Sequence, residues 1–252
     1  MTSTHLEQTL VLFKPDALKN SLTGYLLSQL SEFHTGLYFA GVKIVHVSRP
    51  LAEAHYAEHR QKVFFPSLLD YLMGRIHYPN EPRKRRVIAL VYQGPKATSK
   101  IRTYVGPTDP HTARLEKPGC IRSLGTVVPI LDRQGRVIGQ RMENLLHTSA
   151  DTSEAEREIQ LWFKPNDMPP LMRAYATEVS DTHFYLKDSQ LSTAYEVGAT
   201  CLIAPGDVAW KADLQALRSL SQAKPAGRSL TAVAAKYLIN EEQGADSPRE
   251  LA

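Results

Sequence analysis

Residues 143–149, Glu-Asn-Leu-Leu-His-Thr-Ser, predict a short apolar strand that runs directly into a helix. The helix signal follows at once, because Asp151 and Ser153 are capping residues with a glutamate three positions later, and an amphipathic run covers 155–163. His147 therefore stands at a strand end that faces the start of a helix. Helix N-termini attract anions, and a neutral imidazole is a nucleophile near neutral pH, so this position suits work on a phosphate. A lone histidine is more often structural, so the rest of the chain has to decide.

Outward from this stretch, apolar strands alternate with amphipathic helices. Runs rich in Val, Ile, Leu and aromatic residues predict strands over 8–14, 39–47, 87–92 and 144–147. Apolar residues at helical spacing predict helices over 22–34, 51–60, 66–73, 98–105 and 153–163, with Gly36 ending the first. We therefore expect an α/β (α+β) fold, a ferredoxin-like β-α-β-β-α-β antiparallel sheet with helices on one face.

Two stretches add to this plan. The segment 74–86 ends in the basic run 81–86, Glu-Pro-Arg-Lys-Arg-Arg. It lacks interleaved aromatic residues, so a solvated loop is favoured over a nucleic-acid or polyphosphate surface. Within 123–143, two β runs around a turn at 127–138 predict a hairpin.

The chain divides into a first domain at 7–165 and a mostly helical C-terminal extension at 166–252. Helical spacing predicts helices near 208–220 and 229–239, with a short strand at 199–204 between the first domain and the chain end. The extension has too few apolar residues for a confident separate core, so its apolar faces need burial elsewhere. Those faces comprise Trp210, Leu214 and Leu217 on one helix and Leu230, Val233 and Tyr237 on the other.

The composition sets few limits. The chain has 252 residues, 42% hydrophobic and 22% charged, with a formal net charge of +4, which suits an enzyme handling polyphosphates but equally a basic protein with no such task. No apolar run approaches the length of a membrane span, and no secretory pattern opens the chain. The two cysteines have no metal-like spacing, so we expect a reduced, cytoplasmic protein that does not bind membranes.

Five motifs follow one another at positions that could touch a nucleotide. They are Lys14-Pro15-Asp16, His55-Tyr56 with Phe64-Phe65, Arg102 with Gly106-x-Thr108-x-Pro110, Pro118-Gly119-x-Ile121-Arg122, and Asn144-x-x-His147-x-Ser149. In this order they resemble the nucleoside diphosphate kinase family, over roughly residues 7 to 165. The resemblance implies the antiparallel sheet expected above, with the active site at its edge and a two-helix hairpin over the nucleotide.

The resemblance also implies which residues hold the phosphates. Lys14, Arg102, Arg122 and Thr108 match the family's phosphate-binding set. A lysine at a strand end and arginines with planar forks supply the charge and hydrogen bonds that phosphoryl transfer requires. The family's Mg²⁺ is held mainly through the phosphates, so we expect Mg²⁺ as cofactor without protein metal ligands.

The remaining family positions surround the nucleophile and the nucleoside. His147 resembles the family's phosphoryl-accepting histidine, and Glu158 matches the carboxylate that holds its tautomer. Tyr56 is placed to hydrogen-bond the phosphate or the histidine region. Asn144 matches the residue that contacts the sugar 3′-hydroxyl, and Phe64 matches the aromatic that stacks on the base, although Phe64 could instead be core of its helix.

Departures from the family pattern follow the histidine. The usual His-Gly-Ser-Asp is here His147-Thr148-Ser149-Ala150. A β-branched Thr148 does not take positive φ cheaply, so the loop differs if the family's glycine conformation is needed. Ala150 removes an acidic side chain near the phosphates, for which Asp151 is a partial substitute. The phosphate-binding loop, 106–122, is also a few residues longer than usual.

Three functions compete on this basis. The leading one is a nucleoside diphosphate kinase that passes the γ-phosphate of a triphosphate to a diphosphate through phosphorylated His147, with ping-pong kinetics. The alternative is a nucleotide-binding regulatory module of the same fold with reduced or lost activity, favoured by Thr148 and Ala150. Nucleic-acid binding through 83–86 comes third. The resemblance further implies a dimer-based homo-oligomer, a tetramer or hexamer. Packing on its own first domain or on a neighbouring subunit would each bury the apolar faces of the extension, and we slightly favour the neighbour.

Overall fold

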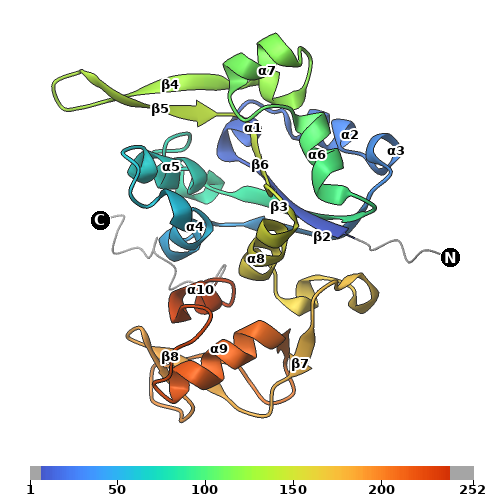
Figure 1. Cartoon of the computed structure of the whole chain (residues 1–252). Helices are drawn as coiled ribbons and strands as arrows, with labels where there is room; N and C mark the ends of the chain where they lie inside the picture. Colours follow the sequence, from blue (N-terminus) through green and yellow to red (C-terminus); the bar gives the residue numbers. More distant parts are fainter. Residues whose placement is uncertain (1–6, 239–252) are drawn as a thin grey trace.

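The computed structural model describes residues 7–238 and is built on one four-stranded antiparallel sheet (Figure 1). The strands are β1 (Glu7–Phe13), β2 (Tyr38–Val45), β3 (Val87–Gly94) and β6 (Leu146–Thr148), in the order β2-β3-β1-β6. All three pairings are antiparallel. The strand that carries the candidate nucleophile is therefore an edge strand, next to the central β1.

Helices cover both faces of this sheet, so the expectation of helices on one face was wrong. Every side chain of β1 beyond Glu7 is buried, and successive side chains along the strand point to opposite faces of the sheet. Leu10 and Leu12 enter one apolar core, and Val11 and Phe13 enter another. The first core receives α4 (Arg49–His55), α5 (Phe65–Leu72) and α8 (Thr152–Trp162), and the second receives α1 (Pro15–Lys19), α2 (Thr23–Gln29) and α6 (Ala97–Val105).

Several helices differ from the sequence prediction, which contained no helix at the position of α1. The helix expected over 22–34 breaks after α2, and α3 (Glu32–Thr35) begins anew because the Ser31 hydroxyl caps it, accepting from the backbone N–H of His34. Gly36 ends α3 with φ of +63°, as its position predicted. A further helix, α7 (Pro110–Glu116), occupies part of the stretch that we interpreted as a loop.

The two added segments adopt ordered structures. The predicted hairpin forms from β4 (Thr126–Leu131) and β5 (Val137–Glu143), which project from the body of the molecule (Figure 1). In the basic run, Arg85 is buried and donates from Nε to the Tyr78 carbonyl at 2.9 Å and from Nη2 to the Pro79 carbonyl at 2.6 Å. Arg85 therefore stabilises the segment 74–86 through these hydrogen bonds, and the basic run 81–86 is not entirely solvated.

The extension contains strands as well as helices, so the description "mostly helical" was wrong. Its strands are β7 (Thr177–Val179), β8 (Phe184–Lys187), β9 (Gln190–Ser192), β10 (Thr200–Ile203) and β11 (Val208–Trp210). They form a three-stranded sheet, β10-β8-β9, and a β11-β7 pair. The helices are α9 (Lys211–Ser221) and α10 (Leu230–Ala235); position 239 of the second predicted helix lies outside the described residues.

The apolar faces of the extension are buried within the chain itself. Leu214, Leu217 and Val233 belong to a third core with Phe184 and Ile203, whereas Trp210 enters the first core beside the sheet. The extension itself and the first domain cover these side chains, which was the less favoured of the two packings that we expected. Across residues 7–238, no helix is long and apolar enough to cross a membrane.

Candidate active site

A strained turn sets the geometry of the site. Leu145 has φ of +70°, a conformation that a branched side chain rarely adopts. Two backbone bonds hold it there. Its N–H donates to Asp16 Oδ2 at 2.9 Å, and its carbonyl accepts from the N–H of Lys14 at 2.9 Å. Because β6 begins at the next residue, this turn directs Asn144 and His147 to the same end of the sheet as Lys14.

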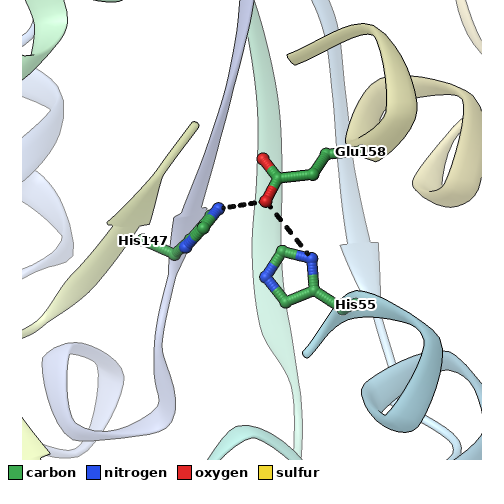
Figure 2. Close-up of side chains that lie close together, drawn as sticks. All are labelled: His55, His147 and Glu158. Carbon is green, nitrogen blue, oxygen red and sulfur yellow. Dashed lines mark ion pairs between the residues drawn. The ribbon is translucent and has the colours of Figure 1, made fainter. Parts of the chain in front are cut away.

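Glu158 of α8 holds His147. The glutamate Oε1 lies 2.8 Å from His147 Nε2, and its Oε2 accepts from the Ser149 hydroxyl at 2.6 Å (Figure 2). Burial alone would raise the pKa of Glu158, but His147, then His55 and the Ser149 hydroxyl, lower it to about 2. The carboxylate is therefore charged, and none of the described residues bonds the other ring nitrogen of His147, Nδ1.

His55 completes this cluster from α4. Its ring centroid lies 4.4 Å from that of His147, nearly perpendicular to it. Burial, and next the neighbouring His147, lower the pKa of His55 well below its usual value. His55 is therefore neutral, and its Nδ1 accepts a hydrogen bond from Trp162 Nε1 at 3.2 Å.

Lys14, one of the cationic residues of the site, forms a hydrogen bond with Asn144. Lys14 Nζ donates to Asn144 Oδ1 at 2.8 Å, and Asn144 Nδ2 donates to the carbonyl of Thr108 at 2.8 Å. Lys14 is buried, and burial lowers its pKa to about 8. These bonds draw the strand end, the turn and the 106–122 loop together.

Arg122 lies against the same loop. It is buried, and its Nη1 donates to the Gly106 carbonyl at 3.0 Å and lies 3.4 Å from the Thr108 hydroxyl. Burial, and next the charge of Arg102 on α6, lower the pKa of Arg122 to about 10, so it remains charged at neutral pH. Arg102 and Thr108 are exposed, and Arg122 Nε is buried without a partner among the described residues.

Tyr56 and Phe64 belong to the clamp, the name used here for the helix pair α4 and α5 that is expected to cover the nucleotide. They differ in their distance from His147. Tyr56 follows the last residue of α4, and its ring centroid lies 6.2 Å from that of His147. Burial, followed by the charge of Glu158, raises the pKa of its phenol. Phe64 precedes α5, is half-buried, and meets the ring of His59 at 5.6 Å. Phe64 thus lies at the clamp and is not brought into the His147 cluster.

The departures from the family pattern are accommodated locally. Thr148 is not among the residues with positive φ; it remains in β6 and pairs with Val11, so the backbone needs no glycine there. Ala150 is exposed, and the Asp151 carboxylate is committed to capping α8, where it accepts from the N–H of Glu154 at 2.9 Å. Asp151 therefore does not reproduce an acid at position 150.

The donor set does not suit a protein-bound Mg²⁺. Within the described residues, one group of three possible metal ligands converges, His55, His147 and Glu158, with atoms within 4.8 Å of one another. Mg²⁺ takes oxygen ligands and keeps several of its waters, whereas this group offers two nitrogens. A Mg²⁺ that arrives on a nucleotide and stays on its phosphates fits this site better.

Three residues near the nucleophile received no role from the sequence. Asp16 fixes the strained turn, Ser149 holds the second oxygen of Glu158, and His55 packs beside His147. All three lie inside the quoted motifs, yet only contacts between distant segments reveal what their side chains touch.

With this geometry in place, comparison with known proteins becomes specific. The family model described as "Nucleoside diphosphate kinase" matches residues 7–168. The chain belongs to the nucleoside diphosphate kinase family. The family match ends near the start of the extension, at α8 and the turn after it, so the strands and helices beyond are additional to the family domain.

Individual relatives agree with this assignment. The chain is 35% identical to a nucleoside diphosphate kinase of Thermococcus kodakarensis over 168 residues, covering 67% of this chain and 83% of the relative. A Mycobacterium leprae relative is 36% identical, covering 62% and 96%. A halophilic nucleoside diphosphate kinase from Halobacterium salinarum, solved in complex with CDP, is 31% identical with a TM-score of 0.50, covering 66% of this chain and 92% of that one.

Proposed function

We propose that this protein transfers the γ-phosphate of a nucleoside triphosphate to a nucleoside diphosphate by way of phosphorylated His147. One observation carries the proposal: His147 Nε2 lies 2.8 Å from buried Glu158, which leaves Nδ1 as the nucleophile. A negative charge on one side of an imidazole fixes the tautomer and raises the basicity of the other nitrogen.

The two half-reactions use the same groups. The Nδ1 lone pair of His147 attacks the γ-phosphorus, the bond to the β–γ bridging oxygen breaks, and the diphosphate leaves with that oxygen. A second diphosphate then attacks the phosphohistidine, and Nδ1 leaves as a neutral nitrogen. Lys14, Arg122 and Arg102 would stabilise the charge on the phosphoryl oxygens, with the Thr108 hydroxyl as a neutral donor.

The remaining positions would orient the nucleoside. Asn144 would contact the sugar 3′-hydroxyl, Phe64 would stack on the base, and the Tyr56 phenol would donate toward the phosphate. Mg²⁺ would be held by phosphate oxygens and would neutralise charge on the leaving diphosphate. The Halobacterium relative crystallised with CDP, which supports a nucleoside diphosphate as one substrate here.

The alternative is a regulatory module that binds nucleotides without turnover. Ala150 favours it, because an acidic side chain is missing beside the phosphates. The charged Glu158 next to His147 favours the enzyme, because binding alone requires no activated histidine. We further propose that the protein works as a dimer-based homo-oligomer, as expected from its family.

Intact-protein mass spectrometry after mixing with ATP and Mg²⁺ separates the two functions. We expect a single phosphate adduct that is labile in acid, stable in base, and removed by ADP or GDP. His147→Ala should lose the adduct and the exchange between ATP and a second diphosphate. The exposed His183 of the extension provides a matched control, and His183→Ala should be phosphorylated like the wild type. Undiminished exchange in His147→Ala would refute the mechanism.

A further inference from the structure

Trp162 assigns the proton on His55. The indole Nε1–H at the end of α8 can only donate, and it donates to His55 Nδ1 at 3.2 Å. A neutral imidazole that accepts at Nδ1 carries its proton on Nε2. Trp162 is fully buried and His55 nearly so, so water does not compete for this bond.

His55 and His147 approach the same carboxylate oxygen. Glu158 Oε1 lies 2.8 Å from His147 Nε2 and 3.7 Å from His55 Nδ1, between the two rings (Figure 2). The other oxygen of Glu158 is already engaged by the Ser149 hydroxyl. A small rotation of the His55 ring would bring its Nδ1 into hydrogen-bonding range of Oε1, provided that Nδ1 carried a proton.

The consequence depends on which tautomer His55 adopts. With the proton on Nε2, His55 Nδ1 has nothing to donate, and His147 Nε2 at 2.8 Å is the nearest donor to Glu158 Oε1, with Arg157 Nη2 farther away at 3.7 Å. With the proton on Nδ1, a second donor would share Oε1 and draw negative charge away from His147. A hydrogen bond to a charged group is strong enough for this competition to change the reactivity of the nucleophile.

We propose that Trp162 is a positioning residue that locks His55 in the Nε2–H tautomer and thereby reserves Glu158 for His147. The inference rests on the proposed role of His147 and extends it to two residues outside the set proposed above to bind the nucleotide.

The tautomer is measured directly on the full chain. In ¹⁵N-histidine NMR spectra at neutral pH, with the His55 signals assigned from their loss in His55→Phe, we expect protonated Nε2 and unprotonated Nδ1. Trp162→Phe should shift His55 toward the Nδ1–H form. This reading requires no catalysis, so it remains valid if the chain transfers no phosphate. Protonated Nδ1 in the wild type would overturn the lock.

Rates then test the consequence for His147. Trp162→Phe should slow phosphorylation of His147 by ATP about tenfold, the effect of weakening one charge-assisted hydrogen bond. The double variant Trp162→Phe/His55→Phe should recover most of that loss, because it lacks the competing donor while keeping the same indole deletion. A double variant as slow as Trp162→Phe would assign the defect to packing and overturn the proposal.

Trp210 provides the matched control. It is also fully buried, and its Nε1 donates to the backbone carbonyl of Phe163 at 2.6 Å. Trp210→Phe removes an equivalent hydrogen bond away from His55. The His55 spectrum and the phosphorylation rate should stay at their wild-type values in this variant, and an equal slowing there would likewise contradict a specific role for Trp162.

Discussion

Lys14 carries its charge in a buried position beside Asn144. Because burial lowers its pKa to about 8, the ammonium is charged at neutral pH and becomes neutral as the pH rises through 8. We expect kcat/KM, which reports groups of the free enzyme, to fall above a midpoint near pH 8. Lys14→Arg should be slower, but its residual activity should not show this decline. A profile that stays flat to pH 9.5 in the wild type would contradict the role of Lys14.

Phe64 tests the clamp. Its ring is half-buried and touches His59, which leaves part of it available for a base. Phe64→Ala should weaken nucleotide binding by about 1–3 kcal/mol, with little dependence on base identity, because every base presents a π face. Titration calorimetry with ADP, GDP and CDP measures this. Unchanged affinity for all three would remove the stacking role.

At this scale the sequence located individual residues better than their contacts. The family motifs single out His147, Lys14 and Arg122, since their spacing along the chain is enough. The partners that fix them come from distant segments: Asp16 supports the Leu145 turn, and Trp162 bonds His55 across 107 positions. No local pattern predicts such pairs, because they exist only after the sheet has formed.

Side-chain contacts anchor the base of the β4–β5 hairpin, whereas the side chains at its tip are exposed. Near the base, Arg141 Nη1 donates to the Ser67 hydroxyl at 2.7 Å, and Glu143 contacts Arg141 at 2.5 Å and His77 at 3.0 Å. The tip exposes Leu131, Val137 and Ile138. The base therefore braces α5, whereas the tip projects from the body of the molecule (Figure 1).

Shortening the hairpin separates these two parts. Replacing 131–138 by a two-residue Asn-Gly turn, which joins the paired residues Ile130 and Gly139, should leave His147 phosphorylation and the melting temperature close to wild type. Arg141→Ala should instead raise KM, because Ser67 on α5 loses its partner. The measurement is steady-state kinetics with calorimetry. An inactive shortened protein would mean that the tip itself takes part in catalysis or folding.

Elements with a long periodic pattern were predictable, and short ones were not. The strands and helices around the sheet follow the expected order within a few residues. The three- and four-residue strands of the extension are too short to show the alternation of apolar and polar residues that predicts a strand. The sequence pattern there indicated mainly its two helices. Helix α7 was not predicted, although Asp109 and Pro110 form a helix start signal, because the motif at 106–110 is that of a phosphate-binding loop.

For the molecule as a whole, the extension is joined to the family domain by apolar and charged contacts. Trp210 enters the core beside the sheet, and α10 packs on α4, α8 and α9 (Figure 1). Buried Asp213 accepts from Lys236 at 2.6 Å and from Arg228 at 2.7 Å, and Arg228 also donates to Gln160 of α8 at 2.7 Å.

This attachment predicts a large effect of one side chain on stability. Trp210→Ala should lower the free energy of unfolding by about 3–5 kcal/mol, the usual cost of deleting a buried large aromatic side chain. Deleting 170–252 should lower the melting temperature further. Denaturant unfolding and calorimetry measure both, and light scattering reports whether the oligomer proposed above changes. An unchanged melting temperature after truncation would show that the extension is an independent module.

The position of Trp210 in the first core has a consequence during synthesis. The family domain ends near residue 168, but the indole that fills its core emerges from the ribosome more than forty residues later. A nascent chain that already contains His147 and Glu158 would still expose the apolar surface that Trp210 covers. Such a chain would be a substrate for chaperones until Trp210 has left the ribosome, so the family domain would be fully synthesised before its core is fully packed.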